Sequence, residues 1–245
     1  MQTIDRMMLV IHTIANVKEE GITISELSKN TKLPLATLHR ILSSLMSHKL
    51  IEQDSETKKY TLGNQWLEYG LMLYDSFDYV STIRPELDRL ANIVNESVYL
   101  NKPLDGESLI MERIDGPNNR IHIVDQIGLR VPMPEGAANK VMLANFTQNQ
   151  VLSALSSKLT EVQLRELIKE LQEIRAQDLA ISYDEHSGET ASLAAAVFSR
   201  SGEVIGAVSI GVLQYSLTSE RIEFLKKELL ISANNISQKL GFLMI

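Results

Sequence analysis

The chain contains no cysteine among its 245 residues. Without thiols it can form neither disulfide bonds nor thiolate metal sites, and it has no cysteine nucleophile. The sequence has no apolar run of membrane length, and its first ten residues, MQTIDRMMLV, are not a basic-then-apolar signal segment. We therefore expect a cytoplasmic protein that makes no membrane contact, with enough length for two modest domains.

Common enzyme motifs are also missing from the sequence. It contains no GxSxG, GxxxxGKS/T, GxGxxG or HExxH pattern, and its five histidines are scattered. No two histidines have the helical spacing of a metal site. His186 lies beside Asp184 and Glu185, where it is either a proton-transfer or weak metal group or part of a solvated loop. We predict that the protein is not an enzyme and that it holds no metal and no cofactor.

The formal net charge of −7 is unevenly distributed along the chain. Residues 1–63 carry eight Lys and Arg against seven Asp and Glu, and the remaining residues carry 16 against 24. No acidic residue lies between Glu26 and Glu52, although four Lys or Arg side chains do. A basic segment in an acidic protein is typical of a nucleic-acid contact. A solvated face that happens to lack acids remains the alternative.

Three helices are predicted before residue 48. Apolar residues recur at helical spacing from Ile4 to Ala15, Thr23-Ile24-Ser25-Glu26 has the spacing of a capping box, and Pro34 fits the first turn of a helix over 35–47. One side of this third helix is apolar. The other is small, polar and cationic, and such a face can enter a major groove, where Arg40 can contact guanine.

A β-hairpin is predicted next, from strands at 50–53 and 59–62 around a polar turn at 54–58. Three helices followed by such a hairpin indicate a winged helix-turn-helix, in which the hairpin, or wing, reaches the DNA backbone or minor groove. Some winged helices bind only proteins, and that alternative stays open. The predicted DNA contacts are Thr23, Ser25, Ala36, Thr37, His39, Arg40, Ser43, Ser44, Thr57, Lys58 and Lys59.

Several blocks of the sequence match a known family in order and spacing. They are Ile24–Ser28, Leu33–Leu42, Leu50–Gly63, Glu112–Gly116, Gly128–Met133, Lys140 with Leu143 and Ala144, and Leu193–Ile210. Through these blocks the chain resembles the IclR family of bacterial transcription regulators over nearly its whole length. Leu35 and Ala36 depart from the basic residue and serine that the family often has. We therefore carry over no base preference.

The resemblance implies an α+β protein with three parts. These are a winged helix-turn-helix domain at residues 1–63 (helix-turn-helix about 23–47, wing about 50–62), a linker and dimerisation helix at 64–82, and an effector-binding domain at 83–245. The last part would be a GAF-like twisted antiparallel sheet flanked by helices. We expect a repressor, although the family also contains activators, that binds palindromic double-stranded operators as a homodimer or tetramer and responds to a small organic effector, commonly a carboxylate.

The predicted linker is rich in aromatic residues. Trp66, Tyr69, Tyr74, Phe77 and Tyr79 are five of the 13 aromatic residues in the chain. Aromatic side chains in this number favour burial over exposure to water, so we expect the segment to be covered either by the same helix of a partner or by the chain's own effector domain. The first arrangement would set the half-site separation near one helical turn, roughly 34–36 Å.

The remaining sequence alternates short apolar runs with polar turns and predicts an antiparallel sheet with flanking helices. We predict strands at 97–101, 107–114, 121–124, 130–133, 192–198 and 204–212, and helices at 83–94, 136–146, 160–177 and 219–240.

A ligand site is predicted at the amino end of the helix that begins near Gly136. Free backbone amides there attract anions, and the small residues Gly136, Ala137 and Ala138 let a carboxylate approach them. Ser192 and Ser209 interrupt apolar strands, so each hydroxyl either faces a polar pocket or bonds neighbouring backbone. From the resemblance we add Met133, Asp184 and Gly211, the last at a position where the family often has serine.

Overall fold

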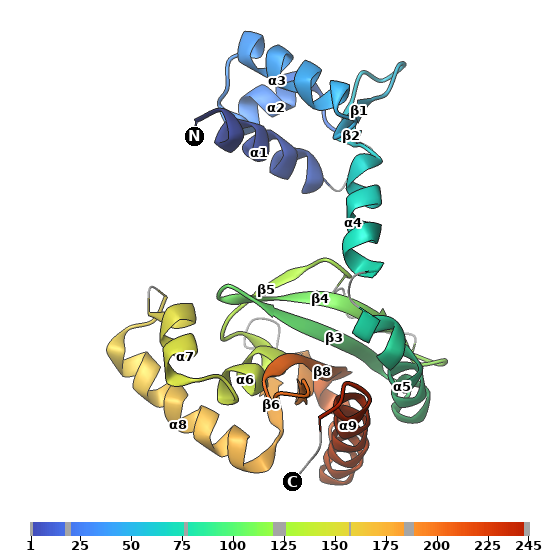
Figure 1. The fold of residues 1–245 in the computed structure, drawn as a ribbon, viewed down its shortest axis with the longest axis vertical. Helices are drawn as coiled ribbons and strands as arrows, with labels where there is room; N and C mark the ends of the chain where they lie inside the picture. The colour runs from blue at the N-terminus through green and yellow to red at the C-terminus, as the bar shows by residue number, and fades with distance from the viewer. Residues whose placement is uncertain are drawn as a thin grey trace. The chain divides into compact units, whose positions relative to one another are not determined.

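The computed structural model of the chain describes residues 2–17, 21–75, 78–119, 126–156, 158–183 and 189–242. The chain forms two compact units, Met1–Asp78 and Tyr79–Ile245, and each is described by itself (Figure 1). Within the described ranges, no helix has both the length and the apolar character needed to cross a membrane.

The first unit is a three-helix domain with a β-hairpin, as the sequence predicts (Figure 1). The helices are α1 (Gln2–Ala15), α2 (Ile24–Thr31) and α3 (Leu35–Ser47), and the antiparallel hairpin joins β1 (Ile51–Gln53) to β2 (Tyr60–Leu62). Helix α4 (Gln65–Asp75) follows. The predicted winged helix-turn-helix fold is therefore confirmed.

Local hydrogen bonds fix the turn between α2 and α3. Thr23 and Glu26 form the predicted capping box at the start of α2, which satisfies amides that the helix itself leaves free. At the other end, Lys32 has a left-handed φ of 57° and the Ser28 hydroxyl donates to the Leu33 carbonyl at 2.8 Å. Leu38 in α3 is fully buried in the core below this turn. The turn and core together hold α3 so that its polar side faces out.

Trp66 at the start of α4 makes a contact that neither prediction for the linker named. It packs against the hydrophobic core of the first unit, and its indole N–H donates to the Leu50 carbonyl at 2.7 Å. Tyr69 is exposed. The side chains of the other three aromatic residues of the linker, at 74, 77 and 79, lie outside the described part of the chain. Trp66 therefore secures α4 to the winged helix that precedes it.

The second unit is built on an antiparallel sheet whose described strands run in the order β5-β4-β3-β8-β7-β6. Their bounds are β3 (Ser97–Leu104), β4 (Glu107–Ile114), β5 (Arg130–Pro132), β6 (Ala180–Tyr183), β7 (Thr190–Phe198) and β8 (Val204–Leu213). The predicted α+β class, with helices flanking an antiparallel sheet, is confirmed. The predicted strand at 121–124 lies outside the described residues.

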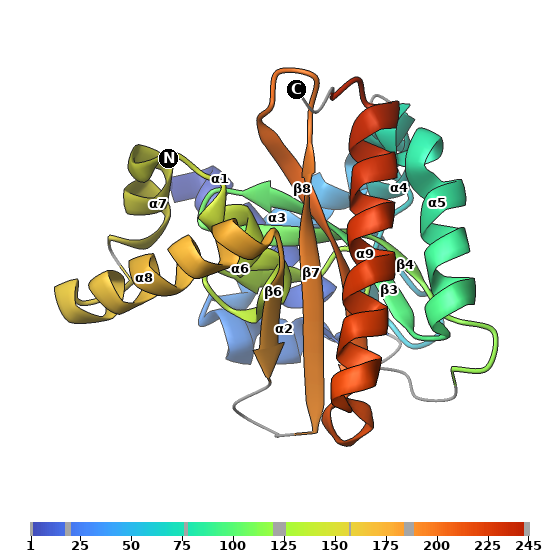
Figure 2. The same cartoon turned by 90° about the horizontal axis from the view of Figure 1, so that it is seen from below.

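Helices cover the two faces of this sheet. Helices α6 (Gly136–Ala144) and α8 (Glu161–Gln177) share a core with Ala194 and Ala196 of β7. Successive strand side chains point to opposite faces, so the buried residues that alternate with these alanines along β7, such as Leu193 and Ala195, face the other way. On that face α9 (Ser219–Lys239) packs along β7 and β8 beside α5 (Asp78–Val94) (Figure 2).

Three elements of the second unit differ from the prediction. Helix α5 begins at Asp78 instead of residue 83 and continues through Pro85, because one proline removes a single backbone donor and its local strain is offset where the helix face is buried. Helix α7 (Gln148–Leu155), which starts at a Thr147–Gln150 capping box, and strand β6 were not predicted at all.

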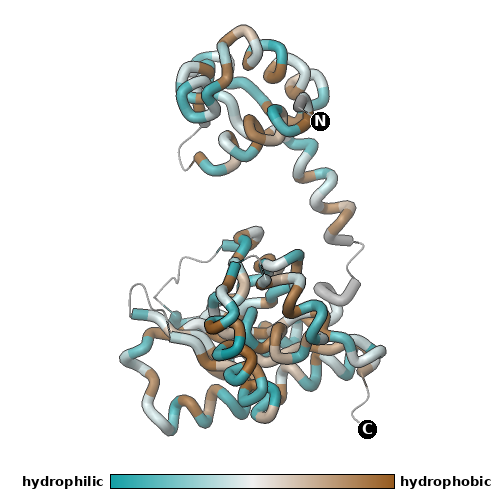
Figure 3. The backbone as a smooth tube through the Cα atoms, turned by 90° about the vertical axis from the view of Figure 1, so that its left-hand side faces the viewer, coloured by the Kyte–Doolittle hydropathy of each residue, from teal (hydrophilic) through white to brown (hydrophobic). Residues whose placement is uncertain are grey.

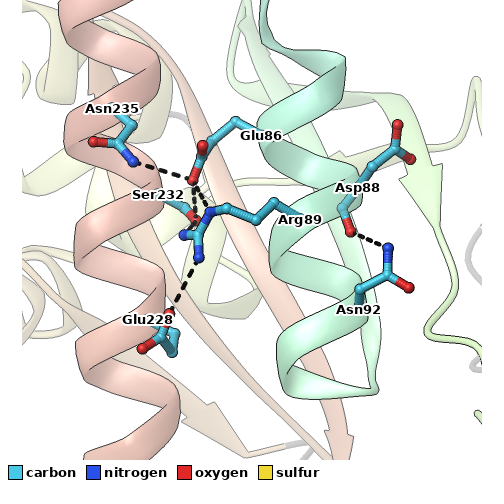
Figure 4. A network of polar contacts seen from close by, with 7 residues as sticks. All are labelled: Glu86, Asp88, Arg89, Asn92, Glu228, Ser232 and Asn235. Carbon is cyan, nitrogen blue, oxygen red and sulfur yellow. Dashed lines mark hydrogen bonds and ion pairs between the residues drawn. The ribbon is translucent and has the colours of Figure 1, made fainter.

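A polar network joins α5 to α9 (Figure 4). The Glu86 carboxylate, only 7% exposed, accepts hydrogen bonds from Arg89 Nε at 2.8 Å, Ser232 Oγ at 2.9 Å and Asn235 Nδ2 at 3.3 Å. Arg89 also donates to Ser232 Oγ and pairs with Glu228 at 3.4 Å. Each of the side chains named in this network thus has a partner, and the network holds the two helices in one relative position.

Candidate nucleic-acid interface and ligand cavity

The outward side of α3 carries the predicted recognition residues. Ala36, His39, Arg40, Ser43 and Ser44 are exposed, and Thr37 is half-buried. Within the described residues, the Arg40 side chain makes no hydrogen bond or ion pair. Its guanidinium is therefore available for bidentate contact with a base or phosphate.

The amino end of α3 adds backbone donors to this surface. Pro34 occupies the capping position, and no side chain caps the helix there. The first amides of a helix have no partner within the helix and attract anions. Helix α3 thus provides both backbone amides and the Arg40 side chain as hydrogen-bond donors for DNA.

Thr23 and Ser25, the predicted contacts near the start of α2, differ in availability. The Thr23 hydroxyl donates to Glu26 Oε2 at 2.7 Å and accepts from the Glu26 amide at 3.4 Å. Ser25 is exposed. The Thr23 side chain therefore stabilises α2, and Ser25 is the freer of the two hydroxyls.

The wing is organised by an acidic residue that the sequence analysis did not single out. Asp54 accepts hydrogen bonds from the Thr57 amide at 2.6 Å, the Thr57 hydroxyl at 2.8 Å and the Glu56 amide at 3.0 Å. These bonds, that from the Thr57 amide first, hold the pKa of Asp54 below its usual value. Lys58 follows with a left-handed φ of 58°. Asp54 and Glu56 balance Lys58 and Lys59 in formal charge. The tip of the wing therefore carries two lysines but no net positive charge.

A cavity of about 610 Å³ opens in the second unit between the sheet and helices α6 and α8. It is lined by residues of β3, β4, β6, β7 and β8 on one side and by the start of α6 on the other. Of the predicted effector residues, six lie in this lining: Gly136, Ala137, Ala138, Ser192, Ser209 and Gly211. The structure thus brings together positions from three separate segments of the chain.

The other two predicted effector residues are not among the lining. Met133 is 2% exposed and packs in the core with Ala137 and Val141, because the backbone at Met133 is tied to Gly106 by a 3.0 Å hydrogen bond. Its side chain therefore supports the cavity wall from behind. Asp184 lies outside the described residues.

Hydrogen bonds orient the two predicted serines differently. Ser192 Oγ accepts from the Ala137 amide at the start of α6, at 3.3 Å. Ser209 Oγ donates to Asn101 Oδ1 at 3.2 Å, in a buried position. Within the described ranges neither hydroxyl is bonded to neighbouring strand backbone, which was the alternative interpretation of these residues.

Further polar groups of the lining come from residues that the sequence analysis missed. Asn139, 1% exposed, donates through its side-chain amide to the carbonyls of Val131, Pro132 and Glu135. Its own Oδ1 and the Ser108 Oγ are buried with no hydrogen-bond partner among the described residues. Unsatisfied buried atoms of this kind destabilise a fold by about 1–3 kcal/mol each, so they are natural partners for a bound polar molecule or water.

The charged residues of the described lining are few. Lys140 Nζ forms an ion pair with Glu170 Oε1 at 2.7 Å, and Glu135 stands at the start of α6. A sequence signal for the missed polar residues did exist, because Asn101, Ser108 and Ser182 each interrupt or end an apolar strand segment as Ser192 and Ser209 do.

Comparison with known families covers nearly the whole chain. Residues 3–55 match the family model described as the IclR helix-turn-helix domain, and residues 72–238 match the one described as the bacterial transcriptional regulator IclR C-terminal domain.

Curated relatives and solved structures agree with these matches. The HTH-type transcriptional regulator KipR of Bacillus subtilis is 27% identical, over 91% of this chain and 91% of its own length. The HTH-type transcriptional repressor AllR of Escherichia coli is 24% identical over 89% and 83%. The fold is similar to a crystal structure of an IclR transcriptional regulator from Alicyclobacillus acidocaldarius, with a TM-score of 0.81, 22% identity and coverage of 98% and 99%. These families and relatives are DNA-binding transcription regulators and not enzymes.

Proposed function

The chain belongs to the IclR family of bacterial transcription regulators, and we propose that it is a repressor that binds a palindromic operator under the control of a small carboxylate. The observation that carries the proposal is that one chain holds both an acid-free, exposed α3 face and a polar cavity. AllR, named as a repressor, supports the sign of regulation. In this proposal residues 1–63 bind DNA, 64–82 link, and 83–245 bind the effector.

For DNA binding we propose that α3 enters the major groove while the amino end of α2 and the wing lie against the backbone. Phosphate contacts release counterions, so the logarithm of the affinity should fall linearly with the logarithm of salt concentration. We expect Lys58→Ala to weaken binding similarly for all sequences and to reduce the slope by about 1 per protomer. Lys227→Ala, an exposed lysine of α9, is the control. Affinity that is independent of salt would favour a winged helix that binds proteins instead.

For the effector we propose that the carboxylate lies at the amino end of α6, against the amides near Ala137 and beside Ser192 and Ser209. The small residues there leave room for it. A binding acid should raise the melting temperature by mass action, and Ser209→Val should abolish that rise because it replaces a polar atom of the wall by a methyl group. The measurement is a thermal-shift screen of small organic acids. If no acid shifts the wild-type protein, the cavity loses its proposed role.

For assembly we propose that α4 packs against α4 of a second copy. Leu67, Leu71 and Met72 are 62%, 58% and 62% exposed, and the tube coloured by hydropathy shows hydrophobic segments along this helix (Figure 3). Adjacent exposed apolar side chains of this size mark interaction surfaces. A dimer would also match the two halves of a palindrome.

The double variant Leu67→Glu/Leu71→Glu tests this assembly, because it places two charges on one face of α4. We expect it to be monomeric in analytical ultracentrifugation at concentrations where the wild type is a dimer or tetramer. Leu152→Glu, on an exposed leucine of α7, is the control and should assemble normally. If the double variant still assembles, the interface does not lie on α4.

A further inference from the structure

We infer that the effector is a hydroxy acid, with one carboxylate at the amino end of α6 and a hydroxyl on the next carbon that donates to Ser209. This inference rests on the proposed function of the cavity and narrows the ligand from small carboxylates to one chemical class. It follows from the hydrogen bonds that the two serine hydroxyls already make within the protein.

Ser192 presents a donor to the cavity. Its Oγ accepts the Ala137 N–H at 3.3 Å, and no residue in the described ranges accepts its hydroxyl proton. A hydroxyl has one proton to give and two lone pairs. The Ala137 amide already donates to Ser192, so the donors left at this end of α6 are the Ser192 proton and the neighbouring amides of the first helical turn, which suit a carboxylate.

Ser209 presents an acceptor to the cavity. Its single proton goes to Asn101 Oδ1 at 3.2 Å, and both residues are at least nine-tenths buried. Only the lone pairs of Ser209 Oγ remain for a ligand. A ligand group that lies against Ser209 must therefore be a donor, such as a hydroxyl, whereas a keto oxygen there would face another acceptor.

The strand register sets the spacing of these two groups. Ser192 of β7 pairs with Gly211 of β8, and Ser209 lies two residues along β8. The two serines are thus diagonal neighbours on one face of the sheet, a relation in which backbones are about 7–8 Å apart. Two hydrogen bonds of about 2.7–2.8 Å to one small molecule span such a gap when its carboxylate and hydroxyl are attached to the same carbon. Gly211, the partner of Ser192, also lines the cavity.

The charges of the lining favour a single carboxylate. Lys140 is already paired with Glu170 at 2.7 Å, and Glu135 adds a further negative charge. A second ligand carboxylate would meet no unpaired cation among the described lining residues. Ile110, Leu167 and Val131 line the rest of the cavity and suit an apolar remainder of the ligand.

The experiment compares matched acids by isothermal titration calorimetry on the full chain. Three series differ only at the carbon next to the carboxylate: propionate, lactate and pyruvate; hexanoate, 2-hydroxyhexanoate and 2-oxohexanoate; phenylacetate, mandelate and phenylglyoxylate. In at least one series we expect the hydroxy acid to bind about tenfold or more tightly than both companions, because it alone offers Ser209 a donor.

Two variants test whether the preference for the hydroxy acid depends on the hydrogen-bonding state of Ser209. Ser209→Ala should bind the hydroxy acid and its unsubstituted companion within about twofold of each other, because the acceptor is gone. Asn101→Leu removes the acceptor of the Ser209 proton, so Ser209 can donate, and the preference should move toward the oxo acid. Ser201→Ala, an exposed hydroxyl in the turn after β7, should leave the wild-type pattern intact.

Each outcome decides between the two proposals. If unsubstituted or oxo acids bind the wild type as tightly as the hydroxy acids, the hydroxy-acid inference is overturned while the effector cavity stands. If hydroxy acids are preferred but Ser209→Ala keeps the preference, Ser209 is not the acceptor and the inference is likewise overturned. If no acid in any series binds, the carboxylate effector itself is wrong, and the inference falls with it.

Discussion

Replacing Arg40 by alanine should weaken specific operator binding by about 1–3 kcal/mol, which is roughly a fivefold to 150-fold loss of affinity. Arg40 is exposed on the outward side of α3 and has no ion-pair partner in the described part of the chain. The free protein therefore loses no interaction when the side chain is shortened. The whole effect should appear in the complex with DNA and none in stability.

The measurement is a binding titration with an operator selected from random-sequence duplexes using the wild-type protein. Specific and non-specific duplexes should be compared at one fixed salt concentration, because a base contact is lost only on the specific site. Arg165→Ala, which shortens an exposed arginine of α8, is the matched control. Unchanged operator affinity for Arg40→Ala would remove this residue from the recognition surface.

Replacing Glu86 by alanine should lower the free energy of unfolding by about 2–3 kcal/mol. Loss of one partner from a buried ion pair destabilises proteins by about 3–5 kcal/mol, and we expect less here because the Arg89 side chain is 34% exposed and water can reach it. The variant leaves Ser232 and Asn235 without their shared acceptor as well. Urea denaturation of the full chain measures the effect.

The neighbouring acid on the same helix provides the control for Glu86. In Figure 4 Asp88 lies on the side of α5 away from α9, and its side chain has no hydrogen-bond partner among the described residues; its backbone carbonyl accepts from Asn92 Nδ2 at 2.8 Å. Asp88→Ala should therefore change stability by less than about 0.5 kcal/mol. Equal effects of the two substitutions would mean that the α5–α9 network contributes nothing specific.

The first unit was predictable because its signals are local. The apolar side of α3, with Leu38 and Leu42 buried, recurs at helical spacing, and the capping box at Thr23 marks the start of α2. Elements that depend on tertiary contacts were harder to predict. The four-residue strand β6 has little pattern of its own and exists because it pairs with β7. Helix α5 passes through Pro85, where local preference alone would have started it later.

The cavity shows the same division between local and tertiary signals. Ser192 and Ser209 were found because a hydroxyl inside an apolar strand is unusual. Met133 lies between a strand and the small residues at the start of α6, which is also where a cavity-lining residue would be expected. Its burial in the core depends on how α6 packs, and the sequence does not show this. The partner of Ser209, Asn101, lies 108 residues away in sequence. No periodicity relates the two, since their contact depends on β3 lying beside β8.

The outermost described strands of the sheet, β5 and β6, are also its shortest, with three and four residues. Short edge strands leave few free backbone groups for a foreign strand, and proline cannot donate to one. Strand β5 ends at Pro132 and carries the exposed, charged Arg130, so both features protect that edge. The sheet should therefore resist edge-to-edge aggregation when the protein is concentrated, which leaves helical surfaces such as α4 to determine how copies associate.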